Sequence, residues 1–86
     1  MDEVIQTLER LAADPSGDMD TAAAEVRRAA GDDRTVLESV RREFQRRIRR
    51  RSDDFTAQRA LRTISAALAP MEREAEFTYF NQTAYR

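Results

Sequence analysis

The chain has 86 residues, a formal net charge of −1 and no cysteine or histidine. This length allows one small domain with a thin core, and the missing residue types exclude disulfides, thiolate or histidine metal sites and the commonest general base. No stretch is long and apolar enough to cross a membrane, and the start of the chain is acidic rather than basic, so we expect one cytoplasmic domain over residues 1–86. We also expect no catalytic residues, cofactor, metal or small-molecule substrate.

The first two predicted helices each carry one apolar stripe. Residues 2–13 repeat apolar side chains at helical spacing, namely Val4, Ile5, Leu8, Leu11 and Ala12. The turn residues at 14–17 end this segment, because proline disfavours helix in the residue before it. Residues 20–30 form the second predicted helix, whose inner face is small: Met19, Ala22, Ala23, Val26 and Ala30. Gly31 is expected to stop it.

The third predicted helix spans residues 34–51. Its apolar stripe consists of Val36, Leu37, Val40, Phe44 and Ile48. Asp33 is a candidate N-cap, and Thr35 with Glu38 is a possible capping box. A dense run of arginine ends the helix, which is the charge that a helix C-terminus favours.

The fourth predicted helix begins at about residue 53 and runs to residue 69, with Ser52, Asp53 and Asp54 offering the cap and the acidic first turn. Its apolar face contains Ala57, Ala60, Leu61, Ile64, Ala67, Leu68, Met71 and Ala75. We expect Pro70 to kink this helix, or to break it before a short helix over residues 71–80. The sequence therefore predicts an all-α fold, a small compact bundle of about four helices whose last helix is long and kinked or broken near Pro70.

Arginine dominates the middle of the chain. Residues 1–40 carry a net charge of −6, whereas residues 41–62 carry +6. Four arginines lie opposite the apolar stripe of the third helix: Arg42, Arg46, Arg49 and Arg50. We expect this run to pair with acids of the first two helices. The alternative is a free face that binds an anionic partner, either an acidic protein or nucleic acid, because the guanidinium fork fits carboxylates and phosphates alike.

Two other arginines of this run, Arg47 and Arg51, fall inside the apolar stripe. We expect the bundle to end near Ile48, so that both side chains reach solvent. The alternative is that Arg47 is partly buried and needs a carboxylate partner.

Aromatic residues crowd the C-terminal segment 77–86, which contains Phe77, Tyr79, Phe80 and Tyr85. Disordered tails are usually poor in aromatics, so we expect this segment to dock. On an unbroken helix, Phe77 and Phe80 face away from the main apolar face, on the side of Phe55. This second surface could be covered in three ways: by another helix of the same chain, by a second copy in a symmetric dimer, or by a different protein partner.

These patterns favour a non-enzymatic helical module for protein–protein interaction, such as an adaptor, an assembly subunit or a regulatory subunit. It would bind a partner protein or a second copy through an aromatic face: Phe55, Phe77, Tyr79, Phe80 and Tyr85. The alternative function is a nucleic-acid-associated regulator that uses the four outer arginines of the third helix.

Overall fold

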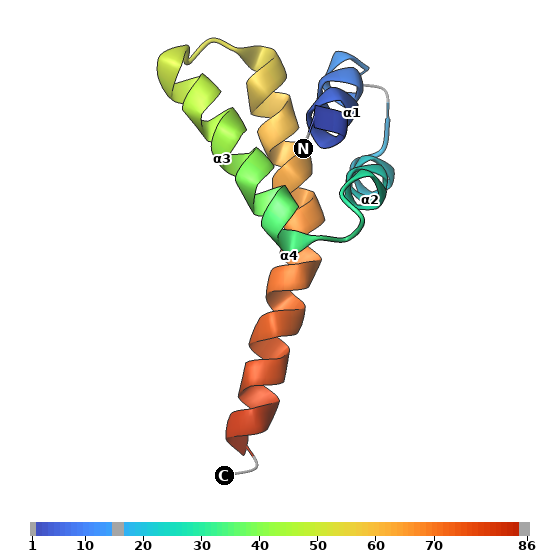
Figure 1. Cartoon of the computed structure of the whole chain (residues 1–86), viewed down its shortest axis with the longest axis vertical. Helices are drawn as coiled ribbons and strands as arrows, with labels where there is room; N and C mark the ends of the chain where they lie inside the picture. Colours follow the sequence, from blue (N-terminus) through green and yellow to red (C-terminus); the bar gives the residue numbers. More distant parts are fainter. Residues whose placement is uncertain (1, 15–16, 85–86) are drawn as a thin grey trace.

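The computed structural model describes residues 2–14 and 17–84, with side chains described as far as Glu72. The helices are α1 (Asp2–Ala13), α2 (Met19–Ala29), α3 (Arg34–Arg50) and α4 (Phe55–Ala84). No strand occurs within these ranges, so the predicted all-α bundle is confirmed. Helices α1, α2 and α3 all pack on the first half of α4, which then continues beyond them (Figure 1). The molecule is therefore elongated, with extents of 48 × 26 × 21 Å.

A single core holds the four helices together. Its large, fully buried side chains are Val4, Leu8, Val26, Leu37, Val40, Phe44, Ile64 and Leu68. They belong to the apolar stripes that the sequence predicts, because helical spacing brings such residues to one side of each helix. The contribution of α4 is partly made of alanine, at Ala57, Ala60 and Ala67. These small side chains let the other helices approach the central helix closely.

Gly31 ends α2, as predicted. Its φ is +64°, a left-handed conformation that glycine adopts without steric cost. The Gly31 N–H donates to the Arg28 carbonyl at 3.1 Å, and the Asp32 N–H donates to the Arg27 carbonyl at 2.9 Å. This pair of bonds is a Schellman motif, which satisfies carbonyls at the end of the helix. Asp32 also has a positive φ, of 58°.

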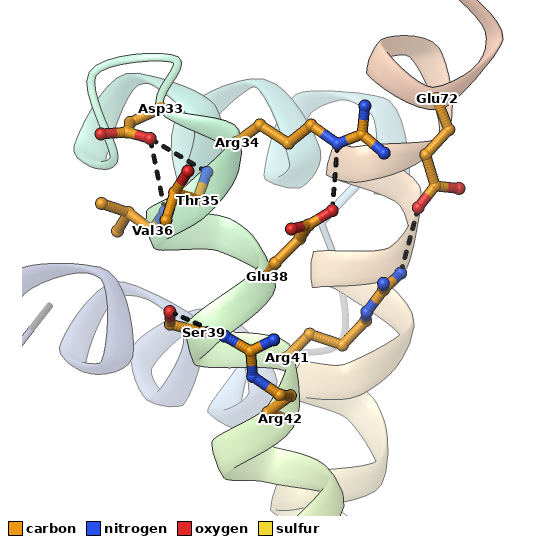
Figure 2. Close-up of polar contacts among 9 residues, drawn as sticks. All are labelled: Asp33, Arg34, Thr35, Val36, Glu38, Ser39, Arg41, Arg42 and Glu72. Atoms are coloured by element: carbon orange, nitrogen blue, oxygen red, sulfur yellow. Dashed lines mark hydrogen bonds and ion pairs between the residues drawn. The ribbon is translucent and has the colours of Figure 1, made fainter. Parts of the chain in front are cut away.

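Asp33 caps α3, as predicted. Its Oδ1 accepts from the Thr35 N–H at 2.9 Å (Figure 2). The possible capping box between Thr35 and Glu38 does not form, because Asp33 already occupies the N-cap position. Glu38 instead accepts from Arg34 Nε at 3.0 Å, one turn earlier on the same helix (Figure 2).

The start of α4 lies two residues later than predicted, at Phe55. Asp54 is the cap, since its Oδ1 accepts from the Ala57 N–H at 3.0 Å. Of the two predicted effects of Pro70, the break is wrong, because α4 is one continuous helix through this position, and a kink is not shown there. Proline leaves a single carbonyl, that of Ala66, without its helical donor. Core packing on both sides of Pro70, by the buried Leu68 and the half-buried Met71, offsets this loss.

Met19 is a second correction, because its side chain is 44% exposed rather than on the inner face of α2. It is the first residue of that helix. There it borders a surface hollow together with Leu11 and Ala22 instead of reaching the core. Ala23 and Val26 carry the buried face of α2.

Candidate interaction surfaces

Four arginines form an exposed row on the outer side of α3, which we call the basic face: Arg42, Arg46, Arg49 and Arg50. The opposite side of α3 is buried in the core. Arg46 Nη2 donates to Glu43 Oε2 at 2.6 Å, and Arg42 Nη2 donates to Ser39 Oγ at 3.3 Å (Figure 2). Within the described part of the chain, Arg49 and Arg50 have no hydrogen-bond or ion-pair partner.

The expected pairing of the basic face with acids of α1 and α2 does not occur. Among the described residues, the one ion pair of these four arginines is that of Arg46 with Glu43 of the same helix. The reason is geometric, because α1 and α2 pack mainly on α4 and leave the outer side of α3 uncovered (Figure 1). The acidic N-terminal helices and the basic face are therefore on different sides of the molecule.

Arg47 does cross to α1, which is the alternative that the sequence left open. Its side chain is 34% exposed, and its Nη1 donates to Glu9 Oε1 at 3.3 Å. Its Nε lies 3.6 Å from Glu43 Oε1, and its guanidinium carbon is 4.7 Å from the centre of the Phe44 ring. Arg47 thus covers the buried Phe44 and links α3 to α1. Arg51 reaches solvent, as expected, with its side chain 78% exposed.

Glu43 is the carboxylate nearest to the basic face. The hydrogen bond from Arg46 lowers the pKa of Glu43 below its ordinary value, and the charges of Arg46, Arg47 and Arg50 act in the same direction. Desolvation opposes this shift. Glu43 therefore stays ionised and offsets part of the charge of Arg46.

The helical residues 73–84, which we call the arm, form the second surface. The bundle makes its contact nearest to the arm through Arg41, whose Nη1 donates to Glu72 Oε1 at 3.3 Å (Figure 2). Beyond Glu72 the backbone of α4 extends past the ends of the other helices, with no helix beside it (Figure 1). Spacing within the arm places Phe77, Phe80 and Ala84 on one stripe, three or four residues apart.

Of the predicted aromatic face, only the side chain of Phe55 is among those that the structure describes, so the face as a whole stays a prediction. Phe55 is 70% exposed at the first residue of α4. It precedes Phe77 by about 33 Å along the helix axis, given the rise of an α-helix. Tyr79 does not share the stripe of Phe77 and Phe80, because residues two apart in a helix lie on different sides. Tyr85 lies outside the described residues.

Sequence reasoning missed a surface hollow of about 220 Å³ between α4 and the α1–α2 connection. Its wall includes Arg59, Arg62 and Thr63 of α4. Arg59 Nη1 donates to the Ala12 carbonyl at 3.2 Å, which satisfies one of the free carbonyls at the end of α1. No local signal predicts this bond, because its partners are 47 residues apart.

A wider open groove is lined by Ile48 of α3 and by Gln58, Leu61, Arg62 and Ser65 of α4.

The described residues contain no cluster of acidic, histidine or cysteine side chains that would hold a metal ion. Nor does any helix of the described chain have the length and apolar character needed to span a membrane. No family model, curated protein or solved structure matches this chain.

Proposed function

We propose that the chain is a non-enzymatic, cytoplasmic interaction module that binds a protein partner through the arm of α4, a second copy being one such partner. The observation that carries this proposal is the length of α4. The helix has 30 residues, whereas the last fully buried side chain among those described, which reach to Glu72, is that of Leu68. The arm extends beyond the helices that pack on the first half of α4 (Figure 1).

Helix physics supports a partner for the arm. The arm extends the folded part of α4 and needs no nucleation, but helix propagation in water is close to neutral, so a helical segment without tertiary packing is only marginally stable. The arm has 12 residues and no other helix beside it (Figure 1). Its stripe of Phe77, Phe80 and Ala84 has the spacing with which helices bind grooves or other helices. Aromatic side chains anchor such interfaces, since each buries a large area.

Sedimentation velocity over a range of concentrations tests the proposal. We expect concentration-dependent association of the full chain and its loss in the double variant Phe77→Ser/Phe80→Ser. The matched control is Thr78→Ser/Gln82→Ser, which changes the opposite side of the same arm. A third chain, ending at Glu72, keeps every core residue whose burial the structure describes and should retain the unfolding midpoint of the bundle.

A different protein partner gives another pattern. The full chain then sediments as a monomer, and a protein captured by it and by the Thr78/Gln82 control is lost with the Phe77/Phe80 variant. A monomer for which the two double variants capture the same proteins would contradict the proposal. So would a chain ending at Glu72 that unfolds with the loss of most of its stability, because the arm would then serve the bundle itself.

A further inference from the structure

We infer that the basic face binds the phosphate backbone of a nucleic-acid duplex, independently of what the arm binds. The four arginines that make up this face are exposed on one side of α3. Helix geometry separates Arg42 from Arg50 by about 12 Å along the axis, with Arg46 about midway. The other side of the helix, which includes Val40 and Phe44, is buried in the core, so the position of this row is fixed relative to the bundle.

The first argument is that two of the four arginines of this face have no ion-pair partner. The described chain contains acids enough to neutralise it, yet Arg49 and Arg50 make no ion pair there. Glu43 and Asp53, the acids close in sequence, pair with Arg46 and with Arg51 respectively. The acidic pI of 5.5 describes the whole chain. It does not describe the potential at this face, because seven of the acids lie in residues 1–30, which form α1, α2 and their connection, away from the outer side of α3.

The charge of the α3 C-terminus does not account for the row. Cations stabilise a helix C-terminus only within about the last turn. Arg49 and Arg50 are in that turn, but Arg42 and Arg46 lie before it. Half of the row therefore has no role in stabilising the C-terminus of α3, and Arg46 acts on this helix only through its pair with Glu43.

The chemistry of the face favours nucleic acid over an acidic protein. Protein interfaces derive most of their energy from buried aromatic or apolar anchors. The aromatic of α3, Phe44, is fully buried, and the residues between the arginines on the outer side are polar. Exposed ion pairs between proteins contribute only about 0–1 kcal/mol each. Phosphate contacts instead release condensed counterions, so a purely charged face is sufficient for binding.

A duplex fits better than a single strand. Single-strand binders combine a basic groove with aromatic side chains on which bases stack. The basic face is the convex side of a helix and presents no aromatic. The exposed Phe55, at the start of α4, is the one exposed aromatic among the side chains described as far as Glu72, and it could change this assignment. It is therefore included in the test.

Salt dependence of binding to a short double-stranded DNA of mixed sequence, measured by fluorescence anisotropy, tests the inference. Four phosphate contacts predict a slope of log K against log salt of about −3.6, or a loss of affinity of about 150-fold between 50 and 200 mM salt. Arg49→Gln/Arg50→Gln should reduce the slope to about −1.8 and this loss to about 12-fold. Arg49→Lys/Arg50→Lys keeps the charge and should keep the slope.

The matched control is Arg27→Gln/Arg28→Gln, which removes two adjacent arginines from the last turn of α2 rather than of α3. It should leave the slope unchanged. The inference is overturned by absence of binding at low salt, by equal effects of the two glutamine double variants, or by equal affinity for polyglutamate. Preference for single strands that disappears in Phe55→Ser would also overturn it, in favour of a stacking site at the start of α4.

Discussion

Arg47 offers the sharpest test of how the bundle is held, because one side chain joins α3 to α1. Arg47→Gln removes the cation over the Phe44 ring and the ion pair with Glu9. A cation–π contact contributes about 0.5–1 kcal/mol when exposed and about 2 kcal/mol when desolvated. An exposed ion pair adds about 0.2–1 kcal/mol. With the side chain 34% exposed, the intermediate range applies, and we expect a loss of about 1.5 kcal/mol in the free energy of unfolding.

Urea unfolding followed by far-UV circular dichroism measures this loss. For a domain of this size, about 1.5 kcal/mol corresponds to a decrease of about 6–12 °C in Tm. Arg46→Gln is the matched control, since it removes an exposed arginine that pairs only within its own helix, and it should cost less than about 0.5 kcal/mol. A double-mutant cycle with Glu9→Gln should give a coupling of about 0.5 kcal/mol. Equal effects of the two arginine substitutions would refute the reasoning, because burial and the aromatic contact would then contribute nothing.

Three further predictions concern the turn after α2, the middle of α4 and the ionisation of Glu43. Gly31→Ala should lower the free energy of unfolding, measured by chemical denaturation, by about 1–2 kcal/mol, and Asp32→Gly should raise it by up to about 1 kcal/mol. Both residues have a positive φ, which favours glycine. An added Cβ at Gly31 meets no atom within 4 Å, so backbone strain is the whole effect of that substitution. Pro70→Ala should raise the Tm and the helical circular dichroism signal, since it restores a donor inside a continuous helix; a lower Tm would contradict the fold. The carboxyl carbon of Glu43, followed by NMR, should titrate below the ordinary pKa of 4.5 and move back up in Arg46→Gln. Because the pKa is lowered in the folded state, the contribution of Glu43 to stability is present above 4.5 and is lost as the pH falls through the lowered value.

Most of the fold could be predicted because it depends on residues close together in the sequence. The apolar stripes follow the helical period, and Asp33 and Gly31 act within their own turns. The break at Pro70 is wrong because proline signals only the local loss of one helix hydrogen bond. The sequence shows the apolar face that continues through Leu68 and Met71, but it does not show the helices that pack against this face.

The candidate surfaces could likewise be predicted only in part. Exposure of the basic face follows from the helical wheel, which places it opposite the stripe that includes Phe44. The pairing of this face could not be predicted in the same way. A net charge of −6 in the first 40 residues shows an excess of acids but not the side of the molecule on which they lie. The Glu9 partner of Arg47 is 38 residues away in sequence, and only the crossing of α1 over α3 selects it.

The positions of the two proposed surfaces lead to one more prediction. The basic face is on α3, and the arm extends away from the end of the bundle at which α3 begins (Figure 1). Within one copy they bind independently, so Phe77→Ser/Phe80→Ser should leave affinity for a short duplex of about 12 base pairs unchanged, because such a duplex spans only about 40 Å.

If the arm joins two copies, however, each particle carries two basic faces. Two molecules 48 Å long that overlap along their arms place these faces less than about 100 Å apart, or about 28 base pairs. A duplex of about 40 base pairs can then contact both faces, and the second contact is intramolecular. We therefore expect the full chain to bind the long duplex at least about tenfold more tightly than the short one, and Phe77→Ser/Phe80→Ser to abolish most of this difference. Equal affinity of the self-associated chain for both lengths, after correction for the number of sites, would refute the arrangement in which the arms pair and the basic faces stay free.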